Sequence, residues 1–390
     1  MTAHEFDAIR IEDLRANGSV KWSMFPNTIG TFVAEMDFGI APAIEQALHS
    51  AVSSAQFGYL PPKMAETMNI ATSGWLKQSA GWDVPPSAIS PLPDVLKALE
   101  ITLEHYSDPK APVILPTPAY MPFFMIPPMF GREIIEVPLI EQNGRQELDL
   151  EAIDAAMAAH GGLFILCNPY NPVGRVFSRE ELVALSEVID RRGGRVFSDE
   201  IHAPLVFSGH QHVAYASVSE AAASHTITST SASKAWNLAG LKCAQIVLSN
   251  EADLKVWEKI GMWSSHGASN LGVIANTAAY TSGLQWLDDV VSYLDGNRRL
   301  LGDLLAEHLP GVRYTMPEGT YIAWLDWRDY AFGDTAAEFL RDNAGVAMTD
   351  GAMCGEPGRG FTRLIFATPR PVLEQAVEQM AAAARVGRAA

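Results

Sequence analysis

The spacing of apolar residues along the chain predicts a series of amphipathic helices. Apolar side chains recur at three- and four-residue steps, which places them on one face of a helix. The predicted helices cover residues 43–54, 63–79, 94–105, 150–159, 179–191, 283–309 and 336–343. Asp94 follows a proline and precedes an apolar run, so we expect it to cap the third of these helices. Before residue 45 we expect an irregular arm.

Short apolar runs between the helices predict buried strands. They cover residues 113–115, 133–138, 163–167, 195–198, 226–229, 244–248, 321–326 and 362–366. Strands that alternate with helices are typical of an α/β fold in which a mostly parallel sheet is wrapped by helices. Such sheets bind ligands beyond the carboxyl ends of their strands. Asn171, Asp199 and Lys234 each follow a strand end, so we expect them to meet at one edge.

The chain of 390 residues is long enough for two or three domains. We expect an N-terminal arm over residues 1–45 and a large ligand-binding domain over residues 46–282. Residues 283–390 are expected to form a long connecting helix and a smaller α+β domain. The arm is expected to join this smaller domain.

Composition narrows the classes of partner. Hydrophobic residues make up 48% of the chain and charged residues 19%, so a large core is expected. The net charge of −17 argues against nucleic acid or an anionic membrane as partner, because phosphate backbones require a basic face. A small anionic ligand, which needs only a local cluster of cations, stays possible.

The cysteines and the N-terminus favour a cytoplasmic protein. Cys167, Cys243 and Cys354 form no C-x-x-C pair, which argues against a disulfide framework and against a structural zinc site. We interpret all three as small buried side chains, and we expect no metal. The N-terminus lacks the apolar core of a signal peptide, and no apolar run is long enough to span a membrane.

The first candidate chemistry lies between Ser229 and Ala244. Ser231 and Ser233 precede Lys234, and Lys242 follows eight residues later. Hydroxyls and a second cation could hold a phosphate, while an amine could form an imine with an aldehyde. Both are needed if Lys234 carries pyridoxal 5′-phosphate (PLP) as a Schiff base. Taken by itself, the pattern is more typical of a solvated surface lysine.

The helix predicted to begin near Asp94 and Val95 would complete a phosphate site with its backbone N–H groups. A carboxylate beside a phosphate is unfavourable, so this interpretation requires the Asp94 side chain to turn away and cap the helix.

Polar residues at the other strand ends fit the same cofactor. Asp199 could keep a pyridine nitrogen protonated, which makes the ring an electron sink, or it could simply cap a turn. Asn171, held between Pro169 and Pro172, could donate to the phenolic oxygen of the ring, or it could serve turn formation. His202 could contact the same edge of the ring, although a packed histidine is the more ordinary interpretation.

Two further residues suit a ring and a carboxylate. Tyr120 follows the proline-rich turn 116–118 and could stack on a flat cofactor, or it could be a core tyrosine. Arg363 lies on a predicted strand between apolar neighbours and needs a partner. A substrate carboxylate and a structural salt bridge are the alternatives.

The order and spacing of Asn171, Asp199, Lys234 and Arg363 resemble the fold-type-I PLP enzymes, the aspartate aminotransferase superfamily. Several longer phrases resemble its MalY/PatB group, the cystathionine β-lyases and cysteine-S-conjugate β-lyases. These phrases are FVAEMDF at 32–38, FGY at 57–59, PTPAY at 116–120, CNPYNPVG at 167–174, SDEIH at 198–202 and SKAWNLAGLK at 233–242. The resemblance runs nearly end to end.

The resemblance implies a role for each candidate residue. Lys234 would hold PLP, with Asp199 at the pyridine nitrogen and Asn171 at the phenolic oxygen. The remaining implied cofactor contacts are Tyr120 and His202 at the ring and Ser231, Ser233, Lys242, Asp94 and Val95 at the phosphate. Arg363, with Asn171 and Tyr59, would bind the substrate. Tyr59 would also reach the phosphate of a neighbouring subunit, which makes the expected protein a homodimer.

Three positions depart from common patterns of the superfamily. His202 stands where many aminotransferases have tyrosine, which suits the lyase branch. Leu92 replaces a glycine often found before the phosphate-binding helix. Ile365 stands where asparagine often follows the arginine, so one contact that supports Arg363 is expected to be absent.

The resemblance implies α,β-elimination from L-cystathionine or another L-cysteine S-conjugate, with a thiol, pyruvate and ammonia as products. Homocysteine from cystathionine would place the enzyme in methionine biosynthesis. An aminotransferase is the first alternative, because it uses the same residues up to removal of the Cα proton. A regulatory protein that retains the fold is the second.

Overall fold

The computed structural model describes residues 2–142, 144–158 and 161–388. Residue 159, the last of the predicted helix 150–159, lies outside these ranges. Residue 1 of the predicted N-terminal arm and residues 389–390 of the predicted C-terminal domain also lie outside them.

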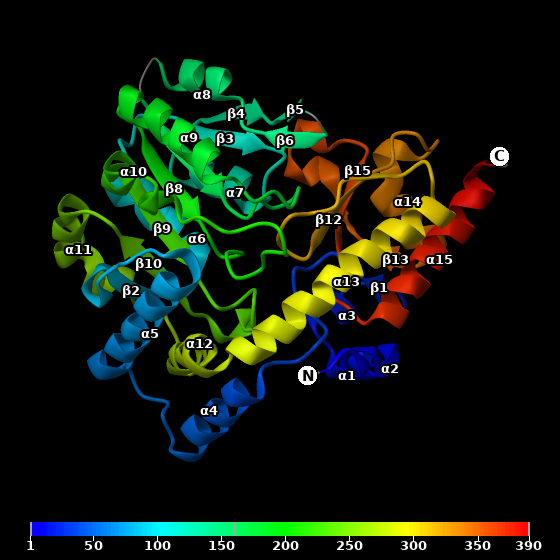
Figure 1. Ribbon diagram of the computed structural model, residues 1–390, viewed down its shortest axis with the longest axis horizontal. Coiled ribbons are helices and arrows are strands. Elements are labelled where there is room, and N and C mark those ends of the chain that lie inside the picture. The colour runs from blue at the N-terminus through cyan, green and yellow to red at the C-terminus, as the bar shows by residue number, and fades with distance from the viewer. Residues whose placement is uncertain (1, 143, 159–160, 389–390) are drawn as a thin grey trace.

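A seven-stranded sheet forms the centre of the molecule (Figure 1). In spatial order its strands are β2 (Ile89–Leu92), β10 (Ala244–Leu248), β9 (Thr226–Thr230), β8 (Arg195–Asp199), β7 (Leu163–Cys167), β3 (Val113–Thr117) and β4 (Ile134–Pro138). The pairings from β9 through to β4 are all parallel, whereas β10 runs antiparallel to both β9 and β2. The predicted α/β class with a mostly parallel sheet is confirmed.

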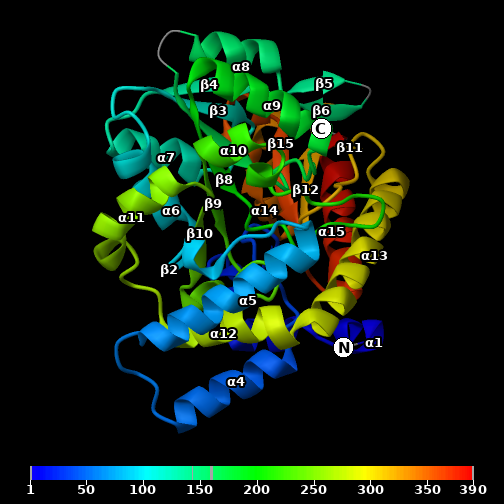
Figure 2. The same cartoon turned by 60° about the vertical axis from the view of Figure 1, so that its left-hand side comes forward.

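Helices cover this sheet on both sides. The helices that precede, flank or follow its strands are α4 (Pro42–Ser53), α5 (Pro62–Ala80), α6 (Val95–Ile101), α7 (Pro122–Met129), α8 (Leu150–Met157), α9 (Arg179–Arg192), α10 (Glu220–His225), α11 (Glu251–Ser264) and α12 (Asn270–Ser282). Helices α8, α9 and α10 pack on one another along one side (Figure 1). Figure 2 shows α12 between α5 and α4, with α4 farthest from the sheet.

A second, smaller sheet lies beside α13 (Leu284–His308), the long helix that periodicity predicted. Its strands are β11 (Arg313–Tyr314), β12 (Ile322–Asp326), β15 (Phe361–Ile365) and β14 (Thr349–Asp350). Helix α14 (Ala336–Ala344) packs on this sheet, and α15 (Arg370–Arg388) packs on α13 and α14. The N-terminal segment reaches this region through β1 (Ile29–Gly30), which pairs in parallel with β13 (Val346–Ala347). A short hairpin of β5 (Ile140–Gln142) and β6 (Arg145–Glu147) stands apart from both sheets. The domain boundaries themselves stay a prediction.

The expectation of an irregular N-terminal arm is wrong in its first half. Helices α1 (Ala3–Asp7), α2 (Ile11–Asn17) and α3 (Val20–Ser23) occupy it. Thr2 and Glu5 form a reciprocal capping box at the start of α1, and Gly18 ends α2 with a φ of 68°. The capping box and the terminal glycine can be recognised in the sequence, but each of these helices is too short to show a repeated apolar pattern.

The sequence patterns also missed strand β2 and the helices α7, α10, α11, α12 and α15. Strand β2 contains Pro91, which an edge strand with a single partner tolerates. Helix α7 contains Pro127 and Pro128. The buried face of α12 consists mostly of small residues, so the sequence shows no stripe of large apolar side chains there. Helix α11 ends with Met262 and Trp263 exposed to solvent, so its pattern is not that of a helix packed on one side.

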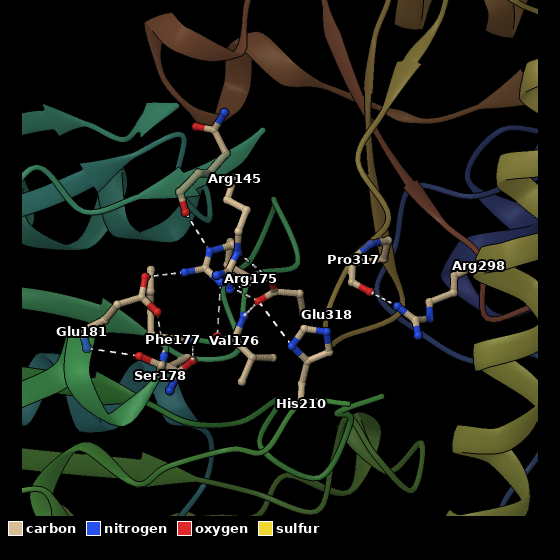
Figure 3. A network of polar contacts seen from close by, with 12 residues as sticks. Arg145, Arg175, Val176, Phe177, Ser178, Glu181, His210, Arg298, Pro317 and Glu318 are labelled. Carbon is tan, nitrogen blue, oxygen red and sulfur yellow. Dashed lines mark hydrogen bonds and ion pairs between the residues drawn. The ribbon is translucent and has the colours of Figure 1, made fainter. Parts of the chain in front are cut away.

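A polar network connects the smaller sheet to loops of the larger one (Figure 3). The carboxylate of Glu318, four residues before β12, accepts hydrogen bonds from Arg145, Arg175 and the Val176 backbone N–H. Arg175 is buried and also pairs with Glu181. The chain entering β12 is therefore fixed to the loop that follows β7.

A buried ion pair fixes the segment that leads from the arm into α4. Lys21 Nζ lies 2.7 Å from Asp37 Oδ2, and Trp22 Nε1 donates to Asp37 Oδ1 at 2.8 Å. Both charged side chains are almost completely buried. In the described part of the chain, no helix is long and apolar enough to cross a membrane.

Lys21→Ala should lower the free energy of unfolding by about 3–5 kcal/mol, because it leaves the Asp37 carboxylate buried without its cation. Thermal and urea denaturation of the purified protein measure this loss. Lys63→Ala is the control, since the Lys63–Glu66 pair is exposed and should contribute less than about 1 kcal/mol. Equal effects of the two variants would contradict the assignment.

Candidate active site

Residues from separate parts of the chain line one cavity of about 200 Å³ at the carboxyl ends of the parallel strands. The lining includes Asn171, Asp199 and Lys234, as the alternation of strands and helices predicted. It also includes Tyr120, His202, Ser233, Lys242, Asp94 and Val95 from the predicted set, with Ala34, Pro93, Leu96, Cys167, Ile201, Ala239 and Cys243 besides.

The register of three neighbouring strands explains this convergence. Cys167 on β7 is paired with Asp199 on β8, which is paired with Ser229 on β9. Because the strands are parallel and in register, the loops that carry Asn171, Asp199 and Lys234 leave the sheet at the same level.

Lys234 is half-buried, and its Nζ donates to the Ala34 backbone carbonyl at 3.0 Å. Burial and the nearby Arg363 lower the pKa of Lys234 to about 8, against the opposing effect of Glu35 and Asp199. A lysine of lowered pKa is neutral, and hence nucleophilic, closer to physiological pH than a surface lysine is.

Asp199 presents a buried carboxyl group to the cavity. Burial raises its pKa to about 7, although the Ile201 N–H and Lys234 favour the ionised form. Its Oδ1 accepts from the Ile201 backbone N–H at 3.1 Å. Within the described part of the chain, Oδ2 accepts no hydrogen bond, so one oxygen is available to a ligand.

Two rings border the same space. His202 is buried, and burial together with Lys234 and Arg363 lowers its pKa to about 3, so the imidazole is neutral. Its Nδ1 has no hydrogen-bond partner among the described residues. Tyr120 also faces the cavity, and burial raises its pKa.

Arg363 lies next to Asn171 but is not among the residues that line the cavity. Arg363 donates to Asn171 Oδ1 at 3.2 Å and to the Phe32 carbonyl at 3.1 Å. Burial lowers the pKa of Arg363, and its Nε has no partner within the described residues. A buried guanidinium without a carboxylate partner can accept an anionic group of a ligand.

The predicted phosphate residues divide into two sets. Ser233, Lys242 and the first turn of α6 face the cavity, and Asp94 caps that turn by accepting from Lys97 N at 2.9 Å. The same Asp94 carboxylate pairs with Lys242 at 2.8 Å. Ser231 is outside the lining, because its hydroxyl donates to the Cys243 carbonyl and accepts from Ser233 N.

Tyr59 lies away from this cavity and is 92% exposed. It lines a larger groove of about 1330 Å³ that Lys242 also borders. The structure therefore connects Tyr59 to the site through that groove, and its contribution to a second subunit stays a prediction.

Comparison with known proteins agrees with this geometry. Residues 33–380 match the family model "Aminotransferase class I and II". The chain is a member of the class I and II aminotransferase family. A cystathionine β-lyase of Corynebacterium glutamicum is 38% identical, with 95% of this chain and 98% of that protein covered.

Two other proteins are also similar to this chain over nearly its whole length. The cystathionine β-lyase PatB of Bacillus subtilis is 32% identical over 95% of this chain and 98% of its own. The solved structure of the PLP-bound C–S lyase of Staphylococcus hominis superposes with a TM-score of 0.88 at 30% identity, covering 97% of this chain and 98% of that one. The expected family is confirmed.

Sequence reasoning missed the contribution of the N-terminal segment to the site. Ala34 and Phe32 act through backbone carbonyls, so their side chains carry no signal of the contact. Tyr321, whose hydroxyl also donates to the Ala34 carbonyl at 2.9 Å, begins a predicted strand and looks like an ordinary core aromatic. Only the phrase FVAEMDF marked this segment as part of the family pattern.

The lowered pKa of Lys234 gives a pH-dependent prediction. With PLP added to cofactor-free protein, the rate of Schiff-base formation should rise with pH through a midpoint near 8, because the neutral amine is the nucleophile. The growth of the visible absorbance band measures the rate. Lys234→Ala is the control for reaction at surface lysines, and a midpoint near the ordinary value of 10.5 would contradict the assignment.

Proposed function

We propose that this protein is a PLP-dependent carbon–sulfur β-lyase that removes a thiol from L-cystathionine or another L-cysteine S-conjugate. The products are the thiol, pyruvate and ammonia, with homocysteine as the thiol from cystathionine. The observation that carries the proposal is the convergence of Lys234, Asp199 and Asn171 on one cavity, in a family whose similar members are named cystathionine β-lyases.

The side chains of the cavity fit the cofactor. Among the described residues, one oxygen of the Asp199 carboxyl group accepts no hydrogen bond, and burial raises the pKa of this group to about 7, which suits a pyridine nitrogen that shares a proton with it. Asn171 accepts from Arg363 through Oδ1, and within the described residues its Nδ2 makes no hydrogen bond, so this group could donate to a phenolic oxygen. The neutral imidazole of His202, with an unpartnered Nδ1, suits the same edge of the ring.

Bound PLP supplies an electron sink for negative charge at the substrate Cα. Lys234 would hold the cofactor covalently and, once displaced by the substrate amine, would take the Cα proton. Asp199 would keep the ring nitrogen protonated, Tyr120 would stack on the ring, and Arg363 would bind the substrate carboxylate.

The phosphate of the cofactor would lie near Ser233, Lys242 and the N–H groups of Val95 and its neighbours. Ser231 would support this site through its bond to Ser233 N, or bind directly after turning from the Cys243 carbonyl. The Lys242–Asp94 pair is partly exposed, so a phosphate can compete with the Asp94 carboxylate for the ammonium.

A second copy of the chain would complete the site. The groove beside Lys242 is bordered by exposed large apolar side chains, which soluble monomers rarely present together. These side chains are Phe57, Tyr59, Ile70 and Met262. We propose a cytoplasmic homodimer in which Tyr59 reaches the partner's phosphate site.

The aminotransferase alternative shares all of these contacts. It differs in the fate of the carbanion, which is reprotonated on the cofactor instead of expelling a thiolate. Turnover that requires a keto acid would favour it. A regulatory role without chemistry would instead survive Lys234→Ala.

Cystathionine incubated with the holoenzyme and no keto acid should yield pyruvate and free thiol. Lys234→Ala should reduce the rate by roughly a hundred- to ten-thousandfold, because it removes the proton-transferring group. Lactate dehydrogenase coupling and a thiol reagent measure the two products, and Lys63→Ala is the control. Absence of both products with wild-type protein would rule the proposal out.

Mixing inactive variants tests the shared site. If Tyr59 serves the partner's site, a hybrid dimer of Tyr59→Ala and Lys234→Ala chains has one site with both changes and one with neither. Unfolding and refolding the two together should restore up to about a quarter of wild-type activity, as random pairing in a twofold dimer gives. No recovery, with dimers shown by light scattering, would contradict the sharing.

A further inference from the structure

One backbone oxygen in the site accepts two hydrogen bonds from different parts of the chain. Lys234 Nζ donates to the Ala34 carbonyl at 3.0 Å, and the Tyr321 hydroxyl donates to the same oxygen at 2.9 Å. A carbonyl oxygen has two lone pairs, so the two donors use its full capacity. The three residues come from the N-terminal segment, the loop after β9 and the start of β12.

The position of Tyr321 is set by a strained backbone corner. Thr320, the residue before it, has a φ of 69°, a left-handed conformation that is costly for a β-branched side chain. Its N–H donates to the Leu205 carbonyl at 2.7 Å, and its hydroxyl accepts from Ile322 N at 3.1 Å. Tyr321 is fully buried, with its ring edge-on to His202 at 5.9 Å.

The segment before this corner is fixed as well, so the strain cannot relax there. Figure 3 shows Glu318 held by Arg145 and Arg175, two residues before Thr320. Gly319 follows, and a side chain there would lie 2.8 Å from the Leu205 carbonyl. The fold therefore places the Tyr321 hydroxyl at a defined point beside Lys234.

The N-terminal segment is held independently of Tyr321. The buried Lys21–Asp37 pair fixes it on one side. The Asn237 side chain accepts from Met36 N and donates to Met36 O, both at 3.0 Å. Because Asn237 is three residues after Lys234, the same loop that carries the amine also holds the segment that carries its acceptor.

We infer that the Ala34 carbonyl, held by the Tyr321 hydroxyl, is the resting site of the Lys234 amine whenever the amine is not joined to the cofactor. Tyr321 is then a positioning residue. It acts through Ala34 to keep the amine within reach of the cofactor before attachment and after each displacement. The inference rests on the proposed attachment of PLP to Lys234.

Sharing the oxygen also has an electrostatic consequence. A carbonyl that already accepts from Tyr321 is a weaker acceptor for an ammonium, so the shared bond favours the neutral amine. The other charged or titratable groups that face Lys234 are Arg363, Asp199, Glu35 and His202. Attachment releases one proton from the ammonium to solvent, forms one C=N bond with the aldehyde of PLP and releases one water.

Tyr321→Phe tests the inference in the full-length protein, freed of cofactor and then mixed with PLP. Loss of one neutral hydrogen bond should slow the appearance of the visible band about fivefold at pH 7.5, where the ammonium predominates. The pH midpoint of the rate should rise by about half a unit to one unit. Borohydride reduction and peptide mapping should show the attachment at Lys234.

Tyr314→Phe is the matched control. Tyr314 lies on the neighbouring strand β11, and its hydroxyl also donates to a backbone carbonyl, that of Arg298, at 3.1 Å. Both variants lose the same kind of bond, so both should lose similar stability. Only Tyr321→Phe should change the rate and midpoint of attachment.

An unchanged rate and midpoint in Tyr321→Phe, or equal changes in both variants, would overturn the inference. If Tyr321→Phe does not fold, a crystal structure of wild-type holoenzyme with L-alanine decides, since this substrate displaces the lysine but has no leaving group. Lys234 Nζ found away from the Ala34 oxygen overturns the inference. Attachment at another lysine overturns the proposed cofactor site, whereas normal attachment without thiol release overturns only the lyase activity.

Discussion

The parallel register of β7, β8 and β9 is the constraint on which the rest of the site depends. It places Cys167, Asp199 and Ser229 side by side, and the next few residues of each chain segment enter the same small cavity. Burying these strands on both faces requires apolar runs, which is why polar groups are confined to the strand ends. The parallel, buried strands therefore account both for the apolar core and for the meeting of the candidate catalytic groups at one edge of the sheet.

Burial shifts the pKa of the acid at this site upward and the pKa values of the two bases downward. It raises the pKa of Asp199 to about 7 and lowers those of Lys234 to about 8 and His202 to about 3, because low polarity always favours the neutral form. Lys234 opposes the shift of Asp199, while Glu35 and Asp199 oppose and Arg363 adds to the shift of Lys234. Asp199 and Lys234, whose pKa values lie near 7 and 8, can exchange a proton with a ligand at modest cost, whereas the imidazole of His202 stays neutral.

The sequence predicted those parts of the fold and site that depend on strong periodicity or on side chains at strand ends. Strands β7, β8 and β9, helix α13 and the residues Asn171, Asp199 and Lys234 belong to this class. Helices α1 to α3 are too short to repeat an apolar pattern several times, and α7 contains prolines that normally interrupt helices, so the sequence patterns predicted none of them. The contacts of Ala34 and Phe32 use backbone carbonyls, and no residue type specifies such a contact in advance.

The backbone contribution of the N-terminal segment has a consequence for assembly of the site. Its Ala34 carbonyl accepts from Lys234, beside the larger sheet, and from Tyr321, beside the smaller one, while its Phe32 carbonyl accepts from Arg363 on β15. Each bond alone is worth about 1 kcal/mol, but they form together only when both sheets are folded and docked. The positions of the Lys234 amine and of the Arg363 guanidinium are thereby coupled through the backbone carbonyls of one segment.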